Sequence, residues 1–443
     1  MSKTRHLNAM YLISMVFNSS MVLYSLVPQI VVLLLCSLFS IYLFIVLRWH
    51  FDNKCSLFLS SVLLVPTSTI SILGTSSAVF PLTWFHLFAI ILFFLVILTE
   101  RIRVQYFALL VVFVILELAI SLFTPNYLDS LKQILTISLF LVSFIIGPSI
   151  SKRVTPSFVH IAAKCYLFST LGFSAQILLQ RSFIRATGII IGHYAAMGVG
   201  RNAFAGLMGD YSFATLYLAT GCMMAIILFN DWQEISLARF ILIELTLLLA
   251  SLIVTSRTGI MALAIILVFY FFNNAKRVGW KVLFLMMVSM VSIPFLMHKI
   301  MSVRGGGQKL LDSSGRLANY SLALHYFVEK PLFGIGLGLN NLSSVLQIAV
   351  PHNFFIQYLV QIGIIGLFLI MLFFAIYFLK DYNKTSNLKW VFWIIVVGSM
   401  LIPDIFSSRF FFVIIIMCTL PVLSHSNHVS GANYEEKESR SIS

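Results

Sequence analysis

The stretch FILIELTLLLASLIVTSRTGIMALAIILVFYFF, residues 240–272, decides how this chain folds. Its only charged residues are Glu244 and Arg257, and it is too long for one ordinary membrane span, which needs roughly 20 apolar residues. An arginine is costly at the middle of a bilayer, and a glycine permits a turn. We therefore divide the stretch at residues 256–259 into two spans. A single tilted helix would instead move every later loop to the other side of the membrane.

Apolar character extends over most of the chain. Of its 443 residues, 60% are hydrophobic and 10% are charged, and the mean hydropathy is +0.99. A soluble domain has about 25% charged residues. The composition therefore predicts an all-α, polytopic integral membrane protein of about twelve to fourteen transmembrane helices. The expected spans lie near residues 8–26, 28–47, 55–73, 82–99, 104–123, 131–149, 156–180, 209–229, 239–255, 259–273, 281–298, 353–379, 389–404 and 409–424.

These spans predict a single transmembrane domain over residues 1–424, with the main periplasmic loop at 299–352 and a disordered cytoplasmic tail at 425–443. The net charge of +14 would suggest a nucleic-acid partner in a soluble protein. Here many cations fall in the short loops expected to be cytoplasmic, as the positive-inside rule predicts. No nucleic-acid partner is expected. The five cysteines are scattered and include no CxxC pair, so neither a disulfide framework nor a metal site follows.

Two loops on the outer side break this charge pattern. The loop near residues 181–208 contains Arg181, Arg185 and Arg201, and the loop at 299–352 is also rich in Lys and Arg. Cations near a bilayer surface suit an anionic ligand, and the guanidinium fork suits phosphate in particular. The alternative is that long loops escape the positive-inside rule and are simply solvated.

The longer of these loops contains a short amphipathic helix, with a start signal at residues 312–314, helical spacing of apolar residues within 316–329 and an end before Pro331. Arg316 lies in its first turn, where a bound phosphate would suit both the arginine and the free N–H groups. A solvated arginine is the alternative. Gly334, Gly336 and Gly338 follow, but their spacing is not GxGxxG and no strand–helix unit surrounds them. We expect a plain turn, with an anion-holding loop as the alternative.

His352 lies where the chain re-enters the membrane, and histidine is the side chain best suited to proton transfer near neutral pH. A structural histidine is the alternative, just as Arg257 at a span end could simply extend its side chain to the interface. Near the last outer turn, Asp404 and Arg409 could form an ion pair. Buried Glu117 and Glu244 leave a transporter open, because intramembrane carboxylates can relay protons.

Five segments carry a family resemblance: TSRTGIMAL (255–263), SGRLANYSLAL (314–324), EKPLFGIGLG (329–338), PHNFFIQYLVQIGIIGL (351–367) and, more weakly, PDIFSSR (403–409). In this order they resemble the O-antigen ligase/polymerase family of bacterial envelope polysaccharide assembly. They cover roughly the C-terminal 180 residues. The chain departs from many family members at Gln361, where those members have an acidic residue.

The resemblance implies a multi-pass protein of the bacterial inner membrane that acts as a metal-independent glycosyltransferase without a cofactor. Its donor would be a glycan on undecaprenyl diphosphate at the periplasmic face. The resemblance assigns the diphosphate to Arg257 and Arg316, and the acceptor hydroxyl to His352. From the outer-loop charge we add Arg185 and Arg201 as expected diphosphate-binding residues.

The chemistry fits these residue types, because arginines can neutralise a leaving diphosphate and a histidine can take the proton of the attacking hydroxyl. We expect polymerisation of lipid-linked repeat units by an inverting transfer. The alternatives are ligation of the glycan to lipid A-core, a polysaccharide transporter or flippase, and a non-catalytic scaffold. Expected partners are the lipid-linked donor, a glycan or lipid A-core acceptor, membrane lipids, and the chain-length regulator and flippase of the same pathway.

Overall fold

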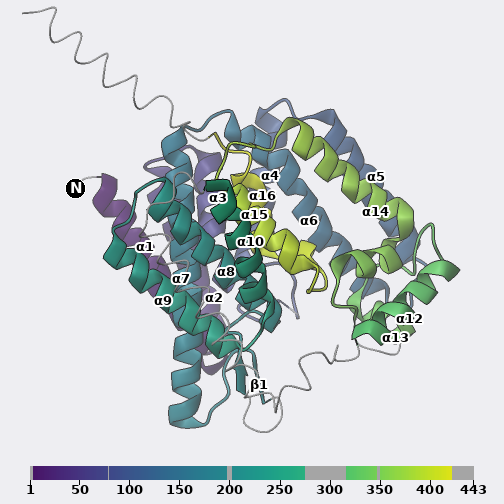
Figure 1. The fold of residues 1–443 in the computed structure, drawn as a ribbon, viewed down its shortest axis with the longest axis horizontal. Helices are drawn as coiled ribbons and strands as arrows, with labels where there is room; N and C mark the ends of the chain where they lie inside the picture. Colours follow the sequence, from purple (N-terminus) through teal and green to yellow (C-terminus); the bar gives the residue numbers. More distant parts are fainter. Residues whose placement is uncertain (1–2, 78, 197–201, 275–315, 347–349, 422–443) are drawn as a thin grey trace, which may run out of the picture.

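The computed structural model describes residues 3–77, 79–196, 202–274, 316–346 and 350–421. These parts of the chain form fifteen α-helices and one small antiparallel hairpin (Figure 1). The helices are α1 (Lys3–Ser20), α2 (Gln29–Arg48), α3 (Asn53–Leu63), α4 (Trp84–Thr99), α5 (Val104–Ser121), α6 (Tyr127–Ser151), α7 (Pro156–Thr187), α8 (Tyr211–Ile226), α9 (Leu237–Val254), α10 (Thr258–Asn274), α12 (Arg316–Glu329), α13 (Leu339–Leu346), α14 (Phe354–Lys380), α15 (Lys389–Ser399) and α16 (Arg409–Met417). Strands β1 (Tyr194–Ala196) and β2 (Asn202–Phe204) pair with Tyr194 opposite Phe204.

The all-α polytopic class is confirmed. By length and composition, eight of the helices in the described ranges can cross a membrane, and α4, α10 and α15 are shorter apolar helices. The sequence led us to expect twelve to fourteen, and the difference has a structural reason. At three expected spans the helix is short, because α3 and α15 have 11 residues each and α16 has 9. The expected span at 281–298 and the tail at 425–443 lie outside the described residues.

The two helix breaks on which the predicted topology depends are present. A 3-10 turn, Met21–Leu26, and Pro28 separate α1 from α2. The long apolar stretch divides as predicted, since α9 ends at Val254 and α10 begins at Thr258. Thr255 closes α9 in the left-handed conformation, with φ of 60°. The turn that carries Arg257 is therefore a real boundary between two helices, and not a bend in one helix.

Charged and polar segments collect at two opposite ends of the helix bundle. All but one of the ion pairs among the described residues lie at what we call the charged end: Lys54–Glu100, Arg153–Glu100, Arg103–Asp381, Lys164–Glu234 and His160–Glu234. The β1–β2 hairpin, α12 and α13 lie at the other end, at the bottom and lower right of Figure 1, which we call the hairpin end. Because the expected cytoplasmic loops contribute the charged end, its composition agrees with the predicted orientation.

Helix α8 lies at the centre of the bundle and organises the hairpin end. Its residues from Ala214 to Ala225 are buried, and it packs against α7, α9, α10 and α15. Small residues allow these helices to approach closely, as is usual in membrane bundles. A Cβ atom added at Gly259 of α10 would lie 2.0 Å from the carbonyl oxygen of Thr215, and one added at Gly398 of α15 would lie 2.4 Å from Leu216 Cδ1. The start of α10 and the end of α15 are thus held against the first turns of α8.

Candidate functional site

Helix α14 is broken at Gly363, whose φ of 61° and ψ of −168° are not helical. A break inside an apolar helix leaves main-chain groups that need new partners. The loop at residues 331–338 supplies these partners from both sides of the break. Its main-chain bonds are Ile335 N to Val360 O (2.9 Å), Gly336 N to Gln361 O (2.8 Å), Ile364 N to Pro331 O (2.9 Å) and Ile365 N to Leu332 O (3.2 Å).

The three glycines of this loop are at positive φ, namely 68° at Gly334, 91° at Gly336 and 118° at Gly338. A side chain at Gly334 would also collide with the main chain of Gln361, 2.5 Å away. The segment is a turn, as predicted, and the element directly before it is helix α12, not a strand. Its function was not predicted: it completes the hydrogen bonding of a broken membrane helix.

A buried polar cluster lies beside the break and joins α6, α14 and the turn between α15 and α16. Its members are Gln133, Gln357, Tyr358, Gln361 and Asp404, each at most 7% exposed. The bonds within the cluster are Gln361 Nε2 to Gln133 Oε1 (3.0 Å), Gln357 Nε2 to Gln361 Oε1 (2.9 Å), Gln133 Nε2 to Asp404 Oδ1 (3.3 Å), Asp404 N to Gln357 Oε1 (2.8 Å) and Tyr358 Oη to Asp404 Oδ1. Burial raises the pKa of Asp404 above its ordinary value, against the hydrogen bond from Tyr358.

His352 is half-buried directly before α14, at the hairpin end. Its main-chain carbonyl accepts a hydrogen bond of 2.9 Å from the hydroxyl of Tyr320 in α12. The next residue, Asn353, caps α14 by accepting from the N–H groups of Phe355 (3.0 Å) and Ile356 (3.2 Å). The Asn353 amide also donates to the carbonyl of Met400 at 3.3 Å. The histidine is therefore held between α12 and the end of α15.

Arg257 lies in the turn between α9 and α10, and its side chain is half-buried. Its neighbours attach this turn to the first residues of α8. Ser256 Oγ donates to Ser212 Oγ at 3.4 Å, and the N–H of Gly259 donates to Thr215 Oγ1 at 3.3 Å. The arginine is thus at the hairpin end, beside the N-terminus of the central helix.

Contacts through α8 and α15 connect Arg257 to His352. Gly259 contacts Thr215 on α8, the adjacent Leu216 contacts Gly398 on α15, and Met400 just beyond α15 contacts Asn353. Arg257 is two residues before Gly259, and His352 is directly before Asn353. The structure therefore brings these two predicted site residues to one end of the bundle, on either side of the end of α15.

Arg316 is the first described residue of α12, and the helix ends at Glu329, before Pro331, as the sequence predicted. Arg316 precedes Tyr320 by four residues, which is about one helical turn, and Tyr320 contacts His352. The side chain of Arg316 lies outside the described part of the structure. The main chain nevertheless places the start of α12 close to the histidine.

Of the two remaining predicted arginines, only Arg185 is among the described residues, and it does not join this group. Arg185 is exposed in the last turn of α7, the 32-residue helix that reaches the hairpin end. Gln176 and Gln180 of α7 bind the hairpin through the N–H groups of Leu207 and Gly206, both at 2.9 Å, and Arg185 lies more than a turn beyond them. Arg201 is outside the described residues.

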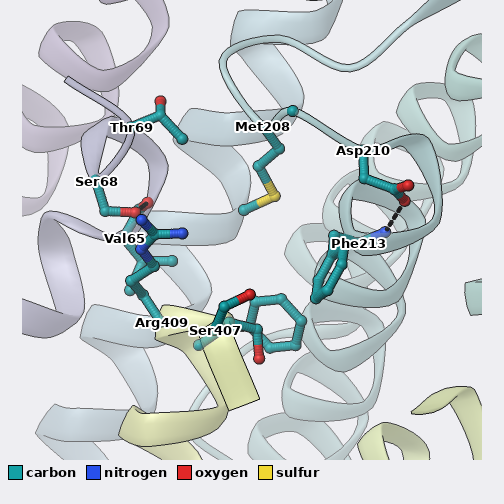
Figure 2. Close-up of a pocket in the computed structure, with 11 residues that line it drawn as sticks. Val65, Ser68, Thr69, Met208, Asp210, Phe213, Ser407 and Arg409 are labelled. Atoms are coloured by element: carbon teal, nitrogen blue, oxygen red, sulfur yellow. Dashed lines mark hydrogen bonds between the residues drawn. The ribbon is translucent and has the colours of Figure 1, made fainter. Parts of the chain in front are cut away.

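A separate pocket opens at the hairpin end. One of its lining residues is Arg409, which the sequence had suggested as the ion-pair partner of Asp404. The cavity measures about 190 Å³ and lies between the N-termini of α8 and α16 and the segment after α3. Figure 2 shows the Arg409 side chain beside Ser68 on one wall, and Asp210 and Phe213 on the opposite wall. Its lining residues are Val65, Ser68, Thr69, Met208, Gly209, Asp210, Phe213, Ser407, Ser408, Arg409 and Phe410.

The suggested ion pair between Asp404 and Arg409 is not formed, since none of the ion pairs among the described residues joins them. The carboxylate of Asp404 instead accepts hydrogen bonds from Tyr358 and Gln133 in the polar cluster. Arg409 lines the pocket. The acidic and basic side chains of the turn between α15 and α16 thus have different direct contacts, although each acts electrostatically on the other.

These features define the chain as a polytopic membrane protein with a polar site at one end of the bundle, next to a broken helix. Residues 242–371 match the family model described as O-antigen ligase. The matched range includes Arg257, Arg316 and His352, and it supports the family resemblance that the sequence motifs indicated. No curated protein matches the chain, and no solved structure does.

Sequence analysis did not identify Gln133, Asp210 or Arg409 as site residues. Gln133 and Asp210 lie outside every motif segment, and Arg409 ends the weakest of them. Gln133 could have been flagged as a polar residue within an apolar run, because such residues are usually satisfied by a partner helix. Nothing in the sequence pairs Asp210 with Arg409, which are almost 200 positions apart.

Proposed function

We propose that the protein is a glycosyltransferase that polymerises undecaprenyl-diphosphate-linked repeat units into O-antigen or a related surface polysaccharide. We further propose that it lies in the bacterial inner membrane with the hairpin end facing the periplasm. The family match supports the reaction class. The observation that carries the site is the placement of Arg257 and His352 on either side of the end of α15, with the start of α12 beside His352.

In this proposal the sugar–phosphate bond of the donor is already activated, so the protein must stabilise the leaving diphosphate and accept one proton. Arg257 and Arg316 bind the diphosphate oxygens and neutralise the charge that develops as the bond breaks. No metal is required for that step, because the guanidinium groups provide the positive charge. Arg185 and Arg201 would add to the positive potential of this surface.

His352 takes the proton of the acceptor hydroxyl as that oxygen attacks the anomeric carbon. The attack comes from the face opposite the diphosphate, so the anomeric configuration inverts. The hydrogen bond from Tyr320 to the His352 carbonyl and the cap formed by Asn353 fix the main chain at His352 and at the next residue. Such fixed positioning is what proton transfer to a single hydroxyl needs.

Ligation to lipid A-core is the first alternative, since it would use the same diphosphate site with another acceptor. A transporter is the second. One observation favours it: Glu117 of α5 is 1% exposed, near Gly366 of the broken helix α14, and its carboxylate has no hydrogen-bond partner in the described structure. Broken helices and buried carboxylates are both found in transporters. The experiment must separate these activities.

The test uses the full chain, purified in nanodiscs and incubated with lipid-linked repeat units from cells that cannot elongate them. Elongation requires at least two repeat units to be joined, with release of undecaprenyl diphosphate. We expect His352→Ala to lower the rate at least about a hundredfold, and Arg257→Ala or Arg316→Ala by about 10²–10³. His325→Ala and Arg239→Ala are the matched controls, because both residues are exposed and outside the site.

Each outcome identifies one activity. Transfer to lipid A-core without elongation indicates the ligase. Movement of lipid-linked units across the bilayer with no new glycosidic bond, and its loss in Glu117→Gln, indicates the transporter. Full elongation by all three alanine variants would disprove the assigned site residues.

A further inference from the structure

Two helix N-termini face the pocket of Figure 2, and they are completed differently. The N-terminus of α8 is capped by Asp210, whose Oδ1 accepts from the N–H groups of Ser212 (2.6 Å) and Phe213 (3.1 Å). The N-terminus of α16 has no side-chain cap. Ser408, at the capping position, instead donates its hydroxyl to the carbonyl of Ile405 at 2.6 Å. The first N–H groups of α16 therefore lack the side-chain acceptor that stabilises such ends.

Arg409 adds a positive charge to this uncapped end. It is the first residue of α16, where the helix dipole favours anions and disfavours cations. Among the described residues Arg409 makes no direct ion pair or side-chain hydrogen bond, and its Nε atom is buried without a partner. The carboxylate of Asp404 acts on the guanidinium charge only at longer range. A half-buried guanidinium that makes no direct ion pair loses hydration without regaining hydrogen bonds, so a group that binds it in the cavity would be stabilising. An anionic group would satisfy the guanidinium and the helix end together.

The opposite wall limits which anion fits. Asp210 uses its Oδ1 as the helix cap and presents a carboxylate to the same cavity, where it would repel a diphosphate with its several charges. The same carboxylate accepts hydrogen bonds from hydroxyl groups. Phe213 and Met208 provide apolar surface. A cation, a hydroxyl acceptor and an aromatic face around about 190 Å³ suit one ring that carries hydroxyls and a single carboxylate.

We propose that this pocket binds one acidic sugar, a hexuronic acid or a similar carboxylated ring, of the glycan substrate. The carboxylate binds Arg409 and the N-terminus of α16, and ring hydroxyls donate to Asp210. This inference rests on the proposed function and names a substrate class for it. The contact between Ser212 and Ser256 places the pocket next to the turn of Arg257, so the bound sugar would lie close to the proposed diphosphate site.

The test measures binding without turnover, using the purified full chain in nanodiscs. The probes are sodium glucuronate, glucose and pyrophosphate, and dissociation constants come from the rise of the unfolding midpoint with probe concentration. We expect glucuronate to bind more tightly than glucose, and Arg409→Gln to weaken glucuronate binding at least about tenfold. Arg409→Lys keeps the charge without the planar fork, so it should weaken binding less.

Arg48→Gln is the matched control, because Arg48 is an exposed arginine in the last turn of α2 and does not line the pocket. This variant should leave all three dissociation constants unchanged. Without any probe, Arg409→Gln should unfold at nearly the same temperature as the parent or a higher one, since it removes a half-buried charge that makes no direct ion pair. A loss of folding in that variant would show that Arg409 has a structural role and would overturn the proposal.

Two further results would also overturn it. One is equal binding of glucuronate to the parent and to both Arg409 variants. The other is a loss of pyrophosphate binding alone, which would assign Arg409 to the diphosphate. Failure of the proposed function is seen separately: elongation would then survive in Arg257→Ala and His352→Ala, whatever Arg409→Gln does to glucuronate binding.

Discussion

The hydroxyl of Tyr320 donates a hydrogen bond of 2.9 Å to the main-chain carbonyl of His352. This bond joins α12, a short helix within the main loop, to the entrance of α14. It also connects two of the family motif segments, 314–324 and 351–367. Tyr320 belongs to the first, one helical turn after Arg316, and His352 belongs to the second. A movement of α12 would therefore move the proposed base and the proposed diphosphate ligand together.

Tyr320→Phe should lower the elongation rate by roughly threefold to tenfold, because a hydrogen bond of this kind contributes about 1 kcal/mol and here it positions the histidine. The unfolding midpoint should change little. Tyr326→Phe is the control on the same helix. Rates measured with saturating lipid-linked substrate would test the prediction, and an unchanged rate in Tyr320→Phe would show that α12 does not position His352.

Gly363→Ala should destabilise the protein by at least about 2 kcal/mol, because alanine disfavours positive φ and has no room in the break of α14. The added Cβ would lie 2.3 Å from the carbonyl oxygen of Leu332 and 2.7 Å from the nitrogen of Gly334. The measurement is the unfolding midpoint in detergent. Gly188→Ala separates the two effects: its φ is 73° but nothing lies within 4 Å of the added atom, so it should cost only about 1 kcal/mol. Equal losses in the two variants would contradict the tight fit.

Glu100→Gln should destabilise the charged end by about 1–3 kcal/mol at neutral pH, because it leaves the buried ammonium of Lys54 without its carboxylate. The hydrogen bond from Lys54 lowers the pKa of Glu100, against an opposing effect of burial. The folded protein therefore binds this proton less readily than the unfolded chain does. The contribution is present above the ordinary pKa of about 4.5 and is lost as the pH falls below it.

Unfolding midpoints between neutral and acidic pH would test this, with the gap between parent and Glu100→Gln closing at low pH. Glu329→Gln is the control, because the pair of Glu329 with His325 is exposed and 3.5 Å apart, and it should change the midpoint very little. A gap that widens on acidification would have the wrong sign and would contradict the assignment.

The fold was largely predictable, because the long apolar runs and the charges between them specify helices and their direction. The division at Arg257 followed from the cost of a charge inside the bilayer, and the end of α12 at Glu329 followed from helical periodicity and Pro331. The short length of α3 was not predictable. Residues 65–83 are also partly apolar, but they form a 3-10 turn and a loop that covers the hairpin end.

The site was predictable only where one residue type already indicates its chemistry. Arg257 and His352 were noticed as a costly charge and a titratable side chain, and their proposed roles came from the family resemblance; the structure places both at the same end. Gln133 and Asp404 acquire meaning only from each other, because an amide on α6 and a carboxylate 271 positions later meet in the fold. Such pairings depend on tertiary packing, which periodicity and composition do not contain.

The polar cluster predicts a compensating pair of substitutions. Gln361 donates through Nε2 to Gln133 Oε1 at 3.0 Å and to the carbonyl of Gly338 at 3.2 Å. Gln361→Glu removes both donors and adds a carboxylate to a buried cluster that already contains Asp404, so it should destabilise the protein by about 2–4 kcal/mol. Asp404→Asn alone should cost less, since asparagine tolerates the positive φ of 50° at this position and can still accept from Tyr358.

The double variant Gln361→Glu with Asp404→Asn again has a single carboxylate in the cluster. Gln133 Nε2 lies within reach of both positions, 3.4 Å from Gln361 Oε1 and 3.3 Å from Asp404 Oδ1, so it can donate to the relocated charge. We expect the double variant to be more stable than Gln361→Glu alone, with a favourable coupling of about 1–3 kcal/mol in a double-mutant cycle of unfolding free energies. Strictly additive losses would show that the two side chains do not share one charge balance, and that the cluster contributes hydrogen bonds only.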